Sequence, residues 1–357
     1  MRVSSLVALH ALVVVAAFAA PAQAGGDPLQ PAQWALPAVA APDAWQSATG
    51  RGAIIAVVDT GVDRDHPEFQ GRLLPGASWV CPRAVQAPCG DWDDRNGHGT
   101  HVAGIAAAPL DGRGIVGVAK DAKILPVRVL DEKGVGIPRH VAAGIRWAVD
   151  QGADVINLSL GGLPLLSQVG GLVGLDGGFF DAINYALDHD VLVVAAAGND
   201  ALPLCSNQEL LSAGVLCVGA VDRDGVRSGY SNFGIGVQVV APGGAGGTPC
   251  GDPREDVLST VAPDGVLLGR CQARHPLGES PTTVPTEALT GYTALAGTSM
   301  AAPHAAGVGA LLAEDGVRGR DAANRIRATA DDLGLPGADL VYGWGQVNAA
   351  KAVAGAP

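Results

Sequence analysis

Alternation of two kinds of segment is the feature that most restricts how this chain can fold. Short apolar runs rich in Val and Ile alternate with alanine-rich stretches whose apolar residues recur at helical spacing. Continuous apolar runs of this kind are typical of strands buried on both faces of a parallel sheet. Strands that alternate with helices favour right-handed β-α-β crossovers. The sequence therefore predicts an α/β fold: a three-layer, doubly wound, mostly parallel sheet with helices on both faces.

The apolar runs place the predicted strands at residues 54–59, 124–130, 155–160, 191–196, 215–221 and 237–240, with a further strand-like segment at 256–261. Helical periodicity predicts helices at residues 98–108, 138–151, 179–189 and 300–313. Loops that are long for a compact domain are usually functional or disordered. Three Gly- and Pro-rich stretches are predicted to be such loop insertions in a single domain, at residues 71–96, 163–178 and 243–290.

Composition supports this fold and excludes other classes of protein. Hydrophobic residues make up 48% of the chain and charged residues 16%, which suggests a membrane protein until one sees that aromatic residues are only 4% and glycines number 51. Small residues let helices pack close to a sheet, and this accounts for much of the composition. No strongly basic stretch occurs, so nucleic-acid binding is not expected. Beyond the N-terminal segment no apolar run is long enough to predict a membrane span in the mature chain.

The N-terminal segment has the pattern of a secretory signal. Arg2 precedes an apolar run at 6–20, and Ala-Gln-Ala at 22–24 resembles a cleavage site. A membrane anchor is the alternative, for which a run of about 15 residues is short. We expect residues 1–24 to be removed, leaving a domain at 25–357 with 22 basic and 35 acidic residues and a net charge of −13. The mature protein is predicted to be secreted, either extracellular or periplasmic.

Export would favour disulfide bonds among the six cysteines, because disulfides persist in oxidising compartments. The cysteines fall into three local couples and contain no C-x-x-C pair, which disfavours zinc and thioredoxin-type sites. Buried free thiols are the alternative, with Cys217 inside an apolar run as their best case. Sequential pairing is preferred, as Cys81–Cys89, Cys205–Cys217 and Cys250–Cys271.

Three motifs carry residues with catalytic chemistry. Asp59 ends a predicted strand, at the edge of an open parallel sheet where active sites gather; alternatively it only caps a turn. His98 and His101 begin a predicted helix at a spacing of three, so they could ligate a metal, or His101 could be a core residue. Ser299 begins another helix among small residues that keep its hydroxyl accessible.

Serine, histidine and aspartate side chains can act together in nucleophilic catalysis. A serine hydroxyl is a poor nucleophile until an imidazole takes its proton, and the imidazole needs an acid to hold its tautomer and stabilise its cation. Ser299 would also have free backbone N–H groups near it at a helix N-terminus. Asn199 follows the strand at 191–196 and could donate to a developing oxyanion, although an Asn in a tight turn is the alternative.

The motifs around Asp59, His98 and Ser299, in that order along the chain, resemble those of subtilisin-family serine endopeptidases, the subtilases. The Ala-Ala-Gly-Asn motif that ends at Asn199 is similar as well. The resemblance runs from about residue 30 to 349 and implies a catalytic triad of Asp59, His98 and Ser299. It implies Asn199 and the Ser299 N–H as oxyanion donors and returns His101 to a structural role.

The resemblance also implies how substrate binds. Segments matching Gly134-Val135-Gly136 and Ser159-Leu160-Gly161-Gly162 hold an extended polypeptide as an added strand in the family. Such backbone pairing tolerates many sequences, so we expect polypeptide substrates and modest specificity. The residues expected to bind substrate are Gly134, Ser159, Leu160, Gly161 and Gly198.

No cofactor is expected for the chemistry, but the resemblance makes a structural calcium ion a candidate. The loop 109–114 matches the family's calcium loop in length, and Gln30, Glu68 and Asp111 match side-chain ligands. Calcium takes six or more oxygen ligands. Glu68 replaces the usual Asp, and Arg113 in the loop is a further departure.

Only residues 25–52 separate the predicted cleavage site from the first strand, too few for a conventional propeptide domain of about 50 residues or more. The sequence thus predicts a secreted, monomeric serine endopeptidase that acts through an acyl-enzyme. Two alternatives stay open: a dedicated processing or transpeptidating subtilase with a single substrate, and an inactive relative that serves as a binding protein.

Overall fold

The computed structural model describes residues 26–81, 87–160, 178–206, 214–246, 251–267 and 291–355. The predicted signal segment, most of the predicted loop at 163–178, and both Cys250 and Cys271 lie outside this part of the chain.

Within the described residues, seven strands form one sheet in the order β2-β3-β1-β4-β5-β6-β7, and every neighbouring pair is parallel. The predicted parallel α/β fold is confirmed. The strands are β1 (Ile54–Asp59), β2 (Ala77–Ser78), β3 (Lys123–Arg128), β4 (Val155–Leu158), β5 (Leu192–Ala196), β6 (Leu216–Val221) and β7 (Val239–Pro242). An antiparallel pair, β8 (Val257–Thr260) and β9 (Tyr292–Leu295), lies beside α3 (His98–Ala107).

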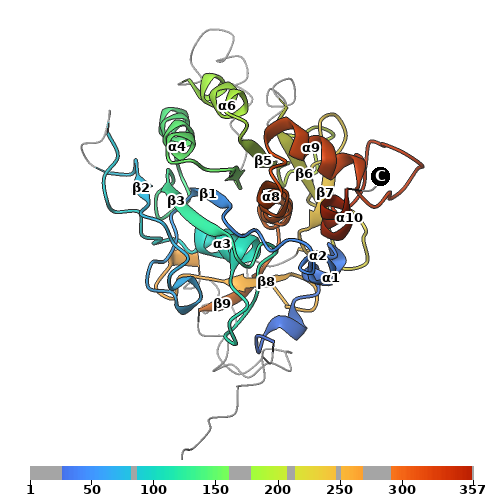
Figure 1. The fold of residues 1–357 in the computed structure, drawn as a ribbon, viewed down its shortest axis with the longest axis horizontal. Helices are drawn as coiled ribbons and strands as arrows, with labels where there is room; N and C mark the ends of the chain where they lie inside the picture. Colours follow the sequence, from blue (N-terminus) through green and yellow to red (C-terminus); the bar gives the residue numbers. More distant parts are fainter. Residues whose placement is uncertain are drawn as a thin grey trace, which may run out of the picture.

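Helices cover both faces of the sheet, as predicted (Figure 1). Along β1 the buried side chains alternate: Ile55 and Val57 join the cluster that contains α3 and α8 (Thr298–Glu314), whereas Ala56 and Val58 join the cluster of α4 (Pro138–Asp150) and α6 (Phe179–Asp188). This is the alternation that a strand buried on both faces requires. Further helices in the described residues are α1 (Ala35–Ala38), α2 (Ala41–Ala44), α9 (Gly319–Ala328), α10 (Ala349–Ala354) and the short 3-10 turns η1 (Gln30–Ala32) and η2 (Pro67–Phe69).

Helix α8 runs through the interior, and every residue from Thr298 to Ala313 is buried. Its glycines are packing residues. A Cβ at Gly307 would lie 2.6 Å from Cβ of Val118, and one at Gly309 would lie 2.4 Å from Cδ2 of Leu192. The high glycine and alanine content therefore follows from a helix that has no solvent face.

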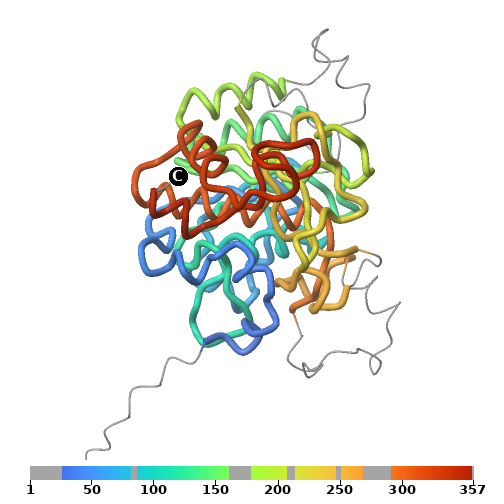
Figure 2. The backbone as a smooth tube through the Cα atoms, turned by 90° about the vertical axis from the view of Figure 1, so that its right-hand side faces the viewer, coloured from blue at the N-terminus to red at the C-terminus, as the bar shows by residue number. Residues whose placement is uncertain are grey.

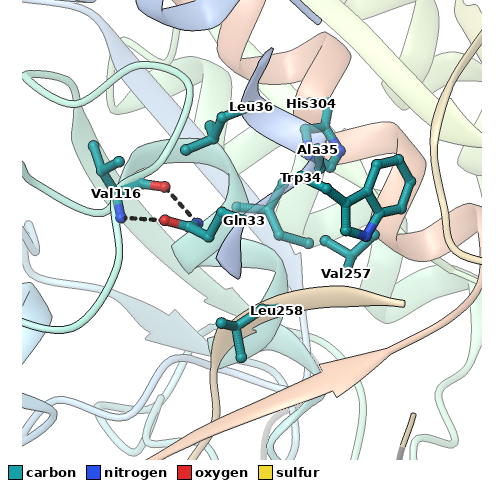
Figure 3. A pocket seen from close by; sticks show the side chains of 9 residues that line it. Gln33, Trp34, Ala35, Leu36, Val116, Val257, Leu258 and His304 are labelled. Atoms are coloured by element: carbon teal, nitrogen blue, oxygen red, sulfur yellow. Dashed lines mark hydrogen bonds between the residues drawn. The ribbon is translucent and has the colours of Figure 1, made fainter. Parts of the chain in front are cut away.

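The N-terminal segment is anchored to residues far along the chain. The side-chain amide of Gln33 donates to the carbonyl of Val116 at 2.8 Å and accepts from its N–H at 2.9 Å (Figure 3). The indole N–H of Trp34 donates to the carbonyl of Asp256 at 3.0 Å. Figure 2 shows the segment beside the loop at 109–114, where Leu29 N–H donates to the carbonyl of Gly114 at 2.7 Å.

Two of the three expected disulfides fall within the described residues, and both are present. Cys81 pairs with Cys89, and Cys205 pairs with Cys217. The second bridge starts just after the Asn199 turn and ends inside β6, so it ties this turn to the sheet. The described part of the chain contains no helix long and apolar enough to cross a membrane.

The C-terminal end of α8 is fixed to the turn that precedes β1. One carboxylate oxygen of Glu314 accepts hydrogen bonds from three successive N–H groups, those of Thr49, Gly50 and Arg51, at 2.7, 2.8 and 3.0 Å. We predict that Glu314→Ala lowers the free energy of unfolding by about 1–3 kcal/mol, because the three donors lose a charged acceptor. Denaturant melts measure this. Asp315→Ala, the same charge change at an exposed neighbour, is the control and should change stability by about 0.5 kcal/mol or less; equal losses in the two variants would contradict the assignment.

Candidate active site

The carboxylate of Asp59 and the imidazole of His98 form the centre of the candidate site. Asp59 ends β1 and is fully buried. Its Oδ1 and Oδ2 lie 2.8 and 3.0 Å from Nδ1 of His98, and Oδ1 also accepts a 2.7 Å hydrogen bond from the N–H of Thr60. An ionised carboxylate only accepts, so the proton of the neutral imidazole resides on Nδ1. Nε2 is left as the nitrogen that can receive a proton.

His98 is in place because the first turn of α3 packs directly on the loop that follows β1. Asn96 Oδ1 accepts from the N–H of His98 at 3.1 Å, and Thr60 Oγ1 accepts from the N–H of Gly99 at 2.9 Å. These N–H groups have no partner inside an α-helix. A Cβ at Gly99 would lie 2.1 Å from the carbonyl oxygen of Gly61, so only glycine allows this approach.

Ser299 lies in the first turn of α8, with 9% of its surface exposed. Its hydroxyl is directed to the carbonyl oxygen of Ser159 at 3.3 Å. Ser159 in turn donates from Oγ to the carbonyl of Ser299 at 2.8 Å, and Asn157 Nδ2 donates to that same Oγ at 2.9 Å. The residues at and after the end of β4 therefore hold the backbone of Ser299.

Neighbouring strands bring these groups to one edge. β1, β4 and β5 are adjacent in the sheet, and Asp59, Ser159 and Asn199 stand at or just beyond their carboxyl ends. This is the edge at which parallel sheets place their sites. The strand order thus brings Asp59, Ser159 and Asn199 to one edge of the sheet.

Asn199 is oriented by the start of α8. Its Oδ1 accepts hydrogen bonds from both the N–H and Oγ1 of Thr298, each at 2.9 Å. The amide nitrogen, Nδ2, is thereby turned away from Thr298 and remains available as a donor on this exposed side chain. Gly198 has φ +109°, and its N–H donates to Thr298 Oγ1 at 3.1 Å. A Cβ there would lie 2.2 Å from Ser206 Oγ, so this turn needs glycine.

The environment changes the pKa of His98. Burial favours the neutral imidazole, but the charge of Asp59 and its hydrogen bond, with a further contribution from the charge of Asp94, outweigh burial and raise the pKa above its ordinary value of 6.5. The Asp59 carboxylate thus stabilises the imidazolium that forms when His98 accepts a proton.

Two other histidines near the site remain neutral. Burial lowers the pKa of His101 to about 3 and that of His304 to about 4. His101 Nε2 bonds the carbonyl of Thr293 at 3.1 Å, and His304 Nδ1 bonds the carbonyl of Met300 at 2.9 Å. Both are core residues of α3 and α8, which agrees with the structural interpretation of His101.

The expected substrate segments flank the edge. Residues 132–136 are exposed, and Gly136 forms an antiparallel bridge with Leu130. Val135 uses its N–H and carbonyl within the turn, bonding the side chain and the N–H of Asp131, both at 2.9 Å. The N–H of Gly134 also donates within the turn, to the carbonyl of Asp131 at 2.9 Å. Pairing with a substrate strand would thus rest on the carbonyl of Gly134 and on Gly136. Leu160 is partly exposed, and Gly161 lies outside the described residues.

The candidate calcium ligands differ from the expected set. Asp111 forms an ion pair with Arg113 at 2.6 Å, and Gln30 Oε1 lies against Gly26, at 2.5 Å from where a Cβ would stand. In the part of the chain that is described, no group of three or more His, Cys, Asp and Glu side chains is placed to hold a metal ion. This result does not support the expected trio of Gln30, Glu68 and Asp111.

Two buried carboxylates in the same region nevertheless fit a cation. Glu68 and Asp27 are almost completely buried, and each has one oxygen, Oε2 and Oδ2, without a hydrogen-bond partner. Burial raises the pKa of Glu68 to about 7, and burial likewise raises the pKa of Asp27. Uncompensated buried carboxylate oxygens are costly, and oxygen donors of this type suit calcium.

Sequence reasoning missed three polar residues that the structure places in or near these sites. Thr60 and Asp94 support the first turn of α3, and Asp27 faces the loop at 109–114. Asp94 lies three residues before Gly97, the N-cap residue of α3, a position that no standard helix-start signal marks. Asp27 carries no local signal, since its partners come from a loop more than eighty residues away.

Comparison with known proteins identifies the family. The sequence model of the Subtilase family matches residues 50–345. Thermitase from Thermoactinomyces vulgaris is 38% identical over 316 residues, which cover 88% of this chain and 93% of thermitase. Subtilisin Savinase from Lederbergia lenta is 33% identical over 326 residues, covering 90% and 99% of the two chains.

A solved structure extends the likeness to the fold. A protease from Pseudoalteromonas arctica PAMC 21717 superimposes with a TM-score of 0.72 at 32% identity, covering 93% of this chain and 99% of the protease. The predicted resemblance to subtilases is confirmed. The chain belongs to the subtilase family and is a serine-type endopeptidase, a hydrolase that acts on polypeptides.

Proposed function

We propose that the protein is exported and cleaves polypeptides with a triad of Asp59, His98 and Ser299. The observation that carries this proposal is the pair of hydrogen bonds from His98 Nδ1 to a fully buried Asp59. It fixes the tautomer in which Nε2 can accept the proton of a serine hydroxyl. Ser299 is the serine that stands at a helix start on the same edge of the sheet.

The first step is attack on the scissile carbonyl. Ser299 Oγ turns from the Ser159 carbonyl toward His98, a rearrangement common between free and substrate-bound enzymes. His98 Nε2 takes the hydroxyl proton as Oγ bonds the carbonyl carbon. The oxyanion then accepts hydrogen bonds from Asn199 Nδ2 and from the N–H of Ser299, which has no intrahelical partner in the first turn of α8.

The second step regenerates the enzyme. His98 gives its proton to the leaving amine, which departs and leaves an acyl-enzyme on Ser299. Water attacks the carbonyl carbon of the ester while His98 Nε2 takes a proton from the water. His98 returns this proton to Ser299 Oγ as the bond between Oγ and the carbonyl carbon breaks, and the carboxylic acid is released. These residues need no cofactor for the chemistry. The substrate backbone would lie as an added strand between Gly134–Gly136 and Ser159–Leu160, with Gly161 continuing the second segment.

Export and domain organisation complete the proposal. Residues 1–24 act as the signal peptide, and residues 25–357 form one peptidase domain. The bridges Cys81–Cys89 and Cys205–Cys217 support an oxidising destination, extracellular or periplasmic. The mature protein acts as a monomer.

Covalent labelling tests the nucleophile. We predict that a fluorophosphonate probe labels the wild-type protein, whereas Ser299→Ala is not labelled and loses at least about 10³ in kcat/KM on unfolded casein. The control is Ser47→Ala, which removes the hydroxyl of an exposed serine outside the site and should still be labelled. Absence of labelling in the wild type would support an inactive binding protein; labelling without turnover of casein would support a dedicated enzyme with a single substrate.

The pH dependence tests the base. Because the pKa of His98 is raised and only the neutral imidazole accepts a proton, we predict that kcat/KM falls with decreasing pH, with a midpoint above 6.5. Asp59→Asn should move the midpoint down and lower kcat by roughly 10⁴. The measurement is kcat/KM for a peptide substrate from pH 4 to 10; a profile that stays flat down to pH 4 would exclude His98 as the base.

The orphaned oxygens of Glu68 and Asp27 support a structural calcium ion held by these two side chains with carbonyl groups of the loop at 109–114. Bound calcium would supply the positive charge that these carboxylates lack. We predict that chelation lowers Tm by several degrees and that Glu68→Gln and Asp27→Asn abolish this response. Asp111→Asn serves as the comparison and should keep it. An unchanged wild-type Tm on chelation would refute the site.

A further inference from the structure

Asp94 is a second buried carboxylate beside the candidate triad, and the mechanism above leaves it without a role. It is 6% exposed and lies in the loop before α3. Its Oδ1 accepts from the N–H groups of Asn96 and Gly97, both at 2.9 Å. Its Oδ2 accepts from the N–H of Thr100 at 2.9 Å and from Thr100 Oγ1 at 2.6 Å. The Asp94 side chain thus connects the loop that precedes His98 to the helical turn that follows it.

The same carboxylate also reaches the strand that carries Asp59. Thr60 Oγ1 donates to Asp94 Oδ1 at 2.9 Å, and this hydroxyl oxygen accepts from the N–H of Gly99 at 2.9 Å. Thr60 is bonded through its own N–H to Asp59 Oδ1 at 2.7 Å. A continuous chain of hydrogen bonds therefore runs from Asp59 through Thr60 to Asp94 and into the helix of His98.

From these contacts we infer that Asp94 is a positioning residue for the triad, holding His98 at a fixed distance and angle to Asp59 through Thr60 and the first turn of α3. The inference rests on the proposed function. It differs from a simple helix cap, because the carboxylate bonds the Asp59 strand and the His98 helix together. Neither Asp94 nor Thr60 touches the reacting atoms.

The charge of Asp94 gives this role a measurable signature. It is one of the charges that raise the pKa of His98, after Asp59. Other ionisable groups surround this region: Asp59 on β1, His101 on α3, and Asp63, Asp91, Asp93, Arg64, Arg95 and Arg128 on the flanking segments. Replacing Asp94 alone changes one of these charges and leaves the rest in place.

The test compares three variants with the wild-type protein. Asp94→Asn keeps the shape of the side chain but removes the charge and sets an amide against the donors of Thr100. We expect kcat to fall about tenfold or more with KM changed about twofold or less, and the acid limb of kcat/KM to move to lower pH. Thr60→Val keeps the charge and removes the bridging hydroxyl. It should lower kcat while the acid limb stays near its wild-type position.

Asp339→Asn is the matched control. Asp339 also accepts several backbone N–H groups, those of Leu335, Val341 and Tyr342 at 2.7–2.9 Å, in the loop between α9 and α10. It should leave kcat and the acid limb unchanged. If Asp94→Asn loses Tm as this control does but keeps wild-type kcat and acid limb, the positioning role is overturned.

The outcomes separate this inference from the proposed triad. If Asp94→Asn does not fold, by circular dichroism, Thr60→Val decides, and wild-type kcat in that variant refutes the inference. Fluorophosphonate labelling and a normal acid limb in the wild type establish the triad independently. A wild type that is not labelled removes the proposed function, whereas a labelled wild type with an unaffected Asp94→Asn removes only the role of Asp94.

Discussion

Close approach of two helices to one edge of the sheet is the constraint on which the rest of this structure depends. α3 can begin against the end of β1 only because Gly99 lacks a side chain at the carbonyl of Gly61. α8 can cross the interior only because Gly307 and Gly309 face Val118 and Leu192. Larger residues at these glycines would push α3 and α8 away from their neighbours, farther than the hydrogen bonds at the helix starts tolerate. This close approach of α3 and α8 to the sheet accounts for the small-residue composition, the burial of both helices and the Asp59–His98 contact.

Backbone N–H groups also hold carboxylate side chains in place at three points of the structure. Asp59 accepts from Thr60 and His98, Asp94 accepts from three N–H groups and two hydroxyls, and Glu314 accepts from three N–H groups. These hydrogen bonds satisfy the oxygens of carboxylates that are buried or partly buried. Asp94 lies at the positive end of the α3 dipole as well. Charge and helix geometry therefore support each other around His98.

Much of the fold could be predicted from sequence because its signals are local. Continuous apolar runs marked β1 and β3–β7 to within a few residues. The sequence interpretation did not include α9, an amphipathic helix that carries three arginines. It also did not include β9, which pairs with a strand more than thirty residues earlier.

At the site, the motifs of Asp59, His98, Asn199 and Ser299 were recognisable, and their positions agree with the strand order. Asp27 was not recognisable, because its partners lie in a loop more than eighty residues away. Asp94 was not, because its bond to Thr60 joins two segments 34 residues apart. Gln30 was expected as a ligand from the family resemblance, whereas Asp27, three positions earlier, is the side chain that is buried against the loop at 109–114.

The anchoring of the N-terminal segment has a consequence for how the chain reaches this state. Trp34 bonds a carbonyl at Asp256, and the carbonyl of Ala38 accepts from Gln346, a separation of 308 residues. Trp34 and Ala38 thus acquire these partners only late in synthesis, whereas Leu29 and Gln33 pair with the segment at 114–116. Folds governed by such distant pairings form slowly. Under the export proposed above, this ordering postpones the completion of the active protease until nearly the whole domain has emerged, and so separates transport from the onset of proteolysis.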